Sequence, residues 1–454
     1  MRFLPAKTAL TIATLAALMA LIDALPQRQN YKLLDYRTLG AVLDFIDRRP
    51  ADTPNPGEQP RSPGLVKPTQ PKLLLTDPAF HLDRFFQALH SAEGRAGQGV
   101  ARILHYGDSP TTADLITSDV RYLLQKQFGD AGHGFCLVAK PWAWYAHKGL
   151  DPEGSGWTID AANYGALKDG MYGLGAVSFR GGPGAFARIK VRDRTYRQVE
   201  IGFLRQPDGG QIHVETNSGD LGLVETSSEQ RGSGFARFRL PDHASEIILR
   251  VTSGSVRVFG ISLEKDSSGV VYHSLGINGG SVSVLARSVN EAHWGEQLRH
   301  YRPNLIVINY GTNESMYPNY VDFASEKEMR EVLRRIRKAA PEASILVMSP
   351  MDRGERLADG EIGTAPAIPR LVAIQERVAR ENGCAFFNTF AAMGGTGTMG
   401  RWYEAEPRLV GADFIHPMPA GAKIVGGLLY QALFQSYNRY KLRLLQNKIM
   451  VAGN

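Results

Sequence analysis

The chain has 454 residues, of which 43% are hydrophobic and 21% are charged, and its net charge is +7. This composition is ordinary for a soluble globular protein and excludes a fibrous or wholly disordered chain. The positive charges are spread along the sequence, so no nucleic-acid partner is predicted, and the charge could only steer an acidic polymer such as a cell-wall glycan.

Residues 1–25 are predicted to be a signal peptide or an N-terminal anchor. Arg2 and Lys7 precede the uncharged run "TALTIATLAALMALI", which has the length of a secretory apolar region and is short for a membrane span. Asp23 interrupts the expected cleavage site, so an uncleaved tether to the inner membrane is the alternative. Residues 26–72 are rich in proline and predict an extended linker. We therefore expect an exported protein of the bacterial cell envelope, in the periplasm.

Residues 73–140 are predicted to be the first part of an α/β domain. The apolar strand "ARILHY" runs directly into a Gly-Asp-Ser corner that holds Ser109. A helical pattern follows and ends at Gly129. The corner alone is equally typical of an ordinary turn between a strand and a helix.

Residues 141–268 are predicted to be an inserted β-sandwich. Short segments alternate apolar and polar residues between Gly-rich turns, a pattern typical of antiparallel strands. The stretch "KPWAWYAH" at the start of the insert contains Trp142, Trp144 and Tyr145. Aromatic residues at such a junction are more often interdomain core, although they can also stack on sugar rings.

Residues 269–440 are predicted to complete the α/β domain. "LIVINY", "SILVMSP" and "CAFFNTF" are continuous apolar runs, as expected for parallel strands buried on both faces, and amphipathic helical patterns separate them. Alternating strands and helices predict a doubly wound parallel sheet of the flavodoxin-like, three-layer kind. In such sheets the active groups gather at the carboxyl ends of the strands.

Four short motifs follow or flank these predicted strands and are therefore expected at one edge of the sheet. They are "GDS" with Ser109, "GINGGS" with Gly279, "YGTNE" with Asn313, and "DFIHP" with Asp413 and His416. Each motif alone is a weak signal, but their order and strand context together predict one active site.

The residue types in these motifs fit acyl transfer by a serine nucleophile. Ser109 needs a base to take its proton, and His416 is the candidate, with Asp413 fixing the imidazole tautomer. The oxyanion of the tetrahedral intermediate needs hydrogen-bond donors. The Ser109 N–H, the Gly279 N–H and the Asn313 amide are the predicted oxyanion hole.

No cofactor or metal is predicted. Neither an HExxH motif nor a close pair of histidines occurs along the sequence. The two cysteines, Cys136 and Cys384, are expected to be buried free thiols, with one disulfide bridge as the alternative.

The four motifs resemble those of the SGNH, or GDSL-type, hydrolases, in which Ser, Gly, Asn and His stand in four ordered blocks. The resemblance covers roughly residues 100–138 and 270–435. It is greatest to bacterial peptidoglycan O-acetylesterases, which carry a β-domain similar to a carbohydrate-binding module between the first two blocks. Pro110 departs from that group, which usually has a bulkier residue after the serine.

The resemblance implies a serine esterase that removes O-acetyl groups from an envelope glycan, with peptidoglycan as the expected substrate. The alternatives are an O-acetyltransferase acting on an envelope polysaccharide and a catalytically inactive glycan-binding protein. The triad motif is shared by the first two functions, so the sequence leaves them open.

Overall fold

The computed structural model describes residues 75–93, 99–165 and 167–452. The predicted leader and linker, residues 1–72, lie outside the described residues. None of the helices in the described ranges is both long enough and apolar enough to cross a membrane.

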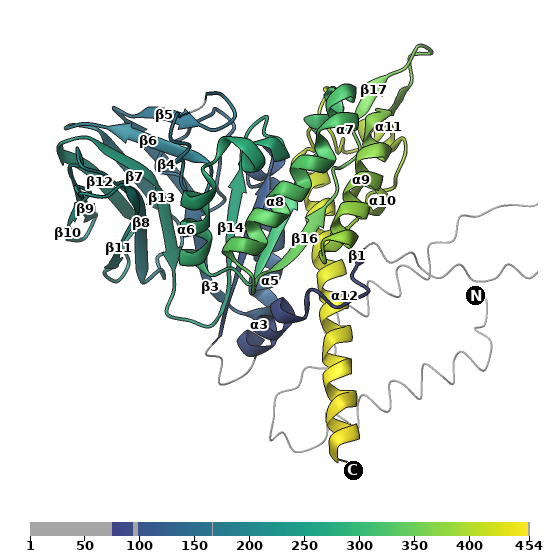
Figure 1. Cartoon of the computed structure of the whole chain (residues 1–454), viewed down its shortest axis with the longest axis horizontal. Coiled ribbons are helices and arrows are strands. Elements are labelled where there is room, and N and C mark those ends of the chain that lie inside the picture. Colours follow the sequence, from purple (N-terminus) through teal and green to yellow (C-terminus); the bar gives the residue numbers. More distant parts are fainter. Residues whose placement is uncertain (1–74, 94–98, 166, 453–454) are drawn as a thin grey trace, which may run out of the picture. The chain divides into compact units, whose positions relative to one another are not determined.

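A parallel sheet forms the middle layer of the α/β domain (Figure 1). Counted along the chain, its strands follow the spatial order 2-1-3-4-5, which is the flavodoxin-like order. They are β2 (Val100–Gly107), β14 (Gly269–Gly276), β15 (Leu305–Asn309), β16 (Ser344–Met348) and β19 (Ala385–Phe387), with the short β1 (Leu75–Thr76) antiparallel to β19 at the edge.

Helices cover both faces of this sheet. On one face lie α3 (Asp83–Glu93), α5 (Leu115–Phe128) and α12 (Pro419–Ala452), and on the other lie α6 (Glu291–Tyr301), α8 (Ser325–Ala339) and α9 (Ala367–Glu381). Successive residues of a strand point to opposite faces of the sheet, so they pack against different helical layers. Ile103, for example, belongs to one buried cluster and Leu104 to the other. The predicted α/β, three-layer fold is therefore confirmed.

Shorter elements form many of the connections between the main strands and helices. They are α4 (Ser109–Thr112), a π-helix (Val284–Ser288), a 3-10 helix (Glu314–Met316), α7 (Pro318–Phe323), β17 (Gly354–Arg356), β18 (Ile362–Thr364), α10 (Thr389–Ala392) and α11 (Thr398–Glu404). Several of these connections carry the motifs singled out in the sequence.

Antiparallel strands fill residues 141–268, and apart from residue 166, which is not described, this stretch contains no helix. One five-stranded sheet has the order β10-β9-β12-β7-β4. The strands of the whole insert, in both of its sheets, are β4 (Leu150–Ser155), β5 (Thr158–Ala161), β6 (Val177–Gly181), β7 (Phe186–Val191), β8 (Gln198–Arg205), β9 (Gln211–Thr216), β10 (Gly219–Glu225), β11 (Gly232–Arg239), β12 (Glu246–Ser253) and β13 (Val256–Glu264).

The second sheet of the insert is continuous with the central sheet, a feature that the sequence did not predict. The joining strand is β3 (Asp130–Cys136), which pairs in parallel with β14 and antiparallel with β13. The pairing satisfies backbone groups on both edges of β3, so no sheet edge separates the insert from the α/β domain. Strands β5, β6, β8 and β11 extend the same sheet beyond β13.

We expect the insert and the α/β domain to unfold together, because a shared hydrogen-bonded sheet couples their stabilities. Urea unfolding followed by far-ultraviolet circular dichroism and by tryptophan fluorescence should give coincident single transitions. Two transitions separated by more than the experimental error would contradict this coupling.

Candidate active site

The Gly-Asp-Ser corner places Ser109 where the first parallel strand ends. β2 stops at Gly107, and Ser109 is the first residue of the short helix α4. A Cβ on Gly107 would lie 2.3 Å from the Thr111 Oγ1, and one on Gly276 would lie 2.0 Å from the Thr112 N. The two glycines therefore allow β2 and β14 to approach α4 closely, and Ser109 remains partly exposed at the carboxyl edge.

Three of the predicted site residues form a continuous hydrogen-bonded chain. The Ser109 Oγ lies 2.8 Å from the His416 Nε2, and the His416 Nδ1 lies 2.7 Å from the Asp413 Oδ2. A hydroxyl, an imidazole and a carboxylate in this order can activate the hydroxyl, because the ring accepts its proton at one nitrogen and is oriented at the other.

Local hydrogen bonds hold the Asp413 carboxylate in this position. Its Oδ1 accepts the backbone N–H groups of Ile415 and His416 at 3.0 and 3.1 Å. Burial acts to raise the pKa of Asp413, but the hydrogen bonds from the His416 ring and from these N–H groups outweigh burial and lower the pKa below its usual value. The carboxylate therefore stays ionised at neutral pH and can stabilise a protonated imidazole.

The second and third motifs are fastened to each other beside the serine corner. The Ile277 N–H donates to the Gly107 carbonyl at 2.9 Å, which joins the Gly279 loop to the end of β2. The Asn313 Nδ2 donates to the Gly280 carbonyl at 2.7 Å, which leaves its second hydrogen free. Gly279 has a φ of 67° and faces open space, and in the part of the chain that the structure describes its N–H donates to no protein acceptor.

Two buried carboxyl groups lie beneath these loops, and their roles were not predicted from the sequence. Asp108 stands at the N-cap position of α4, but its side chain makes no capping hydrogen bond. Burial raises the pKa of Asp108 to about 6, although the Thr312 hydroxyl and the charge of His416 act in the opposite direction. Asp108 is thus buried against the Asn313 loop instead of facing the helix end.

The second buried carboxyl group, Glu314, follows Asn313 directly. Its Oε1 accepts the Val282 N–H at 2.8 Å, and its Oε2 has no hydrogen-bond partner among the described residues. Burial raises the pKa of Glu314 to about 7, opposed by the Val282 hydrogen bond, and the charge of Asp108 raises it further. Together Asn313 and Glu314 fix the Gly279 loop at two points. The only sequence signal for Glu314 was its place in "GTNE".

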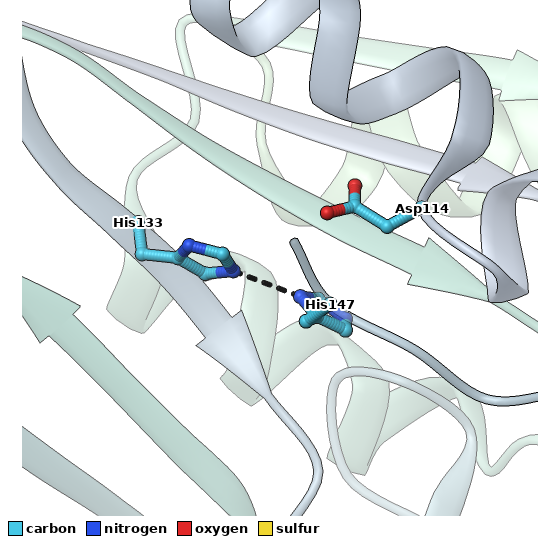
Figure 2. A group of neighbouring side chains, drawn as sticks. All are labelled: Asp114, His133 and His147. Carbon is cyan, nitrogen blue, oxygen red and sulfur yellow. Dashed lines mark hydrogen bonds between the residues drawn. The ribbon is translucent and has the colours of Figure 1, made fainter. Parts of the chain in front are cut away.

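The fold also brings together Asp114, His133 and His147, a group that could in principle hold a metal ion (Figure 2). Their ligand atoms lie within 4.8 Å of one another, and the His133 Nε2 is 2.9 Å from the His147 Nδ1. No sequence motif predicts this cluster, because the two histidines are 14 positions apart on different segments. The sequence alone had indicated no close histidine pair.

The contacts of Asp114 argue against a metal at this cluster. Arg121 binds both carboxylate oxygens, at 3.1 and 2.6 Å, while the Thr117 hydroxyl donates to Oδ1 and the Lys148 N–H to Oδ2. Each oxygen thus accepts two hydrogen bonds, so no lone pair is left for a cation. Burial, together with the Arg121 charge, lowers the pKa of His133 and His147, which keeps both rings neutral at pH 7. The cluster ties the insert to the α4–α5 corner.

The remaining sequence predictions have mixed outcomes. Cys136 and Cys384 are both free and buried, so the alternative of a disulfide is not realised. Tyr145 is buried, as expected for interdomain core, whereas the side chain of Trp144 is exposed.

Part of the chain is similar to a known family of proteins. Residues 255–424 match the GDSL-like lipase/acylhydrolase family. The match includes Gly279, Asn313, Asp413 and His416, but it begins after Ser109, which the insert separates from the rest. No curated protein matches the chain.

Among solved structures, one described as a peptidoglycan O-acetylesterase in action has a TM-score of 0.69 and 22% sequence identity, covering 81% of this chain and 99% of that chain. The similarity establishes a shared fold over nearly the whole of that protein. A family two carbohydrate esterase from Clostridium thermocellum has a TM-score of 0.29 and 11% identity, covering 60% of this chain and 99% of that chain. A salicylyl-acyltransferase from a tetracycline biosynthetic pathway has a TM-score of 0.31 and 14% identity, covering 66% and 96%.

We expect Glu314→Gln to alter how stability depends on pH. Because the pKa of Glu314 rises from 4.5 to about 7 on folding, its stabilising contribution is full below pH 4.5 and is lost as the pH rises through 7. Glutamine keeps an acceptor for Val282 and cannot ionise. The free energy of unfolding of the variant relative to wild type should therefore rise by about 3 kcal/mol between pH 4.5 and pH 8.

Urea unfolding of both proteins at the two pH values measures this difference. The buried histidines, whose lowered pKa values act in the opposite direction, are common to both proteins and cancel. A difference that stays constant with pH would show that Glu314 does not titrate in this range.

Proposed function

We propose that this protein is a serine esterase that removes O-acetyl groups from a cell-envelope glycan, with peptidoglycan as its substrate. The observation that carries the proposal is the chain of hydrogen bonds from Ser109 through His416 to Asp413 at the carboxyl edge of the sheet. These intact hydrogen bonds between the three side chains also argue against a catalytically inactive glycan-binding protein.

In the proposed reaction, the Ser109 Oγ attacks the acetyl carbonyl carbon while its proton passes to the His416 Nε2. The carbonyl oxygen becomes an oxyanion that accepts hydrogen bonds from the Ser109 N–H, the Gly279 N–H and the Asn313 amide. Collapse of this intermediate breaks the ester bond, and the His416 proton leaves with the sugar hydroxyl. Water then attacks the acetyl-enzyme with His416 as base, releasing acetate and restoring Ser109.

The exposure of the triad favours water over a sugar as the acceptor of the acetyl group. The side chains of His416 and Asp413 are 51% and 47% exposed. A transferase must keep water away from its acyl-enzyme, and a half-exposed base does not do so. We therefore favour hydrolysis over O-acetyl transfer.

Several observations support a glycan of the envelope as the substrate. The fold is shared with a structure described as a peptidoglycan O-acetylesterase, and the net charge of +7 suits an acidic polymer. The apolar run in residues 1–25 supports export, although it lies outside the described residues. The location in the periplasm is part of the proposal.

Ser109→Ala should abolish acetate release from O-acetylated peptidoglycan, by about 10⁴-fold or more, because the nucleophile is removed. The thermal unfolding midpoint should stay close to that of wild type, since Ser109 lies at a partly exposed corner. Ser91→Ala, an exposed serine on α3, is the matched control and should retain full activity.

A panel of acetylated peptidoglycan, acetylated xylan and acetylated chitooligosaccharides would identify the preferred polymer. Activity that persists in Ser109→Ala would remove the serine from the mechanism. Release of acetate from xylan but not from peptidoglycan would overturn the substrate assignment while leaving the esterase intact.

Asn313→Ala should lower kcat by about 10²-fold and change KM by less than about twofold, because the lost donor acts on the oxyanion and not on the bound ester. Asn313→Asp separates donation from packing, since it keeps the shape of the side chain and loses the donor. Both variants are measured with p-nitrophenyl acetate. An effect confined to KM would place Asn313 outside the oxyanion hole.

A further inference from the structure

An aromatic group from the insert lies beside the catalytic loops. The side chains of Trp144 and Tyr164 are 74% and 66% exposed, which is unusual for such large rings. Trp142 is partly buried and packs against the main core, and its ring meets that of Tyr164 in an edge-on contact with the centroids 6.1 Å apart. Trp142 thus gives Tyr164 a fixed support.

Backbone and amide hydrogen bonds attach this group to two of the catalytic motifs. The Ala146 N–H, two residues after Trp144, donates to the Thr112 carbonyl at 3.2 Å in the helix that begins with Ser109. The Asn163 Nδ2, next to Tyr164, donates to the Asn278 carbonyl at 2.6 Å. The Asn278 Nδ2 in turn lies 3.5 Å from the Tyr164 hydroxyl. Asn278 directly precedes Gly279, so the segments that carry the rings are hydrogen-bonded to the Ser109 helix and to the Gly279 loop.

We propose that Trp144 and Tyr164 form a sugar-binding subsite that holds a pyranose ring of the glycan next to the acetylated residue. The inference rests on the proposed function and goes beyond it by naming the residues that bind the polymer. The insert then contributes to substrate binding at the active site itself. It does so through the loop with Trp144, which is hydrogen-bonded to α4, and the loop with Tyr164, which is hydrogen-bonded to the Gly279 loop.

The chemistry of the rings fits a sugar better than an acyl chain. An aromatic face carries partial negative charge, which attracts the C–H groups on the flat face of a pyranose, while the sugar hydroxyls stay in water. Exposed rings suit such a half-solvated ligand, whereas an acyl chain needs an enclosed apolar pocket. The Asn278 amide and the Tyr164 hydroxyl lie at the edge of the group and can hydrogen-bond to hydroxyls or acetamido groups.

Trp144→Ala and Tyr164→Ala should each raise KM for an O-acetylated chitooligosaccharide by about tenfold, as expected for loss of an aromatic binding contact. The effect on p-nitrophenyl acetate, which has no sugar, should be at least about fivefold smaller. Trp144→Phe keeps an aromatic face and should restore much of the affinity. Tyr122→Ala removes a ring that is 62% exposed on α5, in neither loop, and is the matched control.

Equal losses on both substrates would show that the rings support the catalytic corner, and no loss on the glycan would show that they do not bind it. Either result overturns the subsite. A change in the preference between p-nitrophenyl acetate and p-nitrophenyl octanoate would assign the rings to an acyl chain and would also overturn it.

A binding measurement separates this inference from the proposed function. Ser109→Ala protein titrated with chitohexaose, which carries no O-acetyl groups, should show a change in tryptophan fluorescence that is lost in Ser109→Ala/Trp144→Ala. Failure of wild type to deacetylate any glycan, with this binding intact, would reject the function and retain the subsite. Absence of binding, with normal deacetylation by wild type, would reject the subsite alone.

Discussion

The hydrogen bond between the Ser109 Oγ and the His416 Nε2 joins two residues that stand 307 positions apart. It can form because β2 and β19 run parallel in one sheet, so the chain leaves both strands at the same edge. The serine comes from the end of the first central strand and the histidine from the loop before the last helix. The proposed reaction depends on that convergence, and the sheet order 2-1-3-4-5 provides it.

Hydrogen bonds from two neighbouring side chains hold the loops around this bond in place. Asn313 and Glu314 fix the Gly279 loop through the Gly280 carbonyl and the Val282 N–H. Burial of Glu314, with one oxygen unpartnered among the described residues, is unfavourable for the charged carboxylate. Its pKa is therefore raised. Donors that are fixed before the substrate arrives need no reorganisation during the reaction, which is the benefit of such an arrangement.

The continuity of the sheet through β3 and β13 changes the role of the insert. A separate sandwich on a linker would bind a polymer at a distance from the site, whereas a sandwich that shares a sheet holds its loops at a constant position. The buried cluster of Asp114, Arg121, His133 and His147 adds a second connection near the serine corner. The exposed aromatic rings at this junction are therefore carried by segments that are joined to the Ser109 corner.

The sequence by itself determined the fold class, and it predicted five site residues. Strands buried on both faces must be continuously apolar, and helices that cover a sheet must be amphipathic. Turns at strand ends tolerate the small polar residues that catalysis needs. Each of these patterns is set by residues that are close together in the sequence. The tertiary structure alone decided that β3 would join two sheets, that Glu314 would be buried, and that Asp114 would meet Arg121 and two histidines. It also decided that Tyr145 would be covered and Trp144 exposed. These features depend on contacts between distant segments, and burial, pairing and pKa are properties of such contacts and not of the residue types that make them.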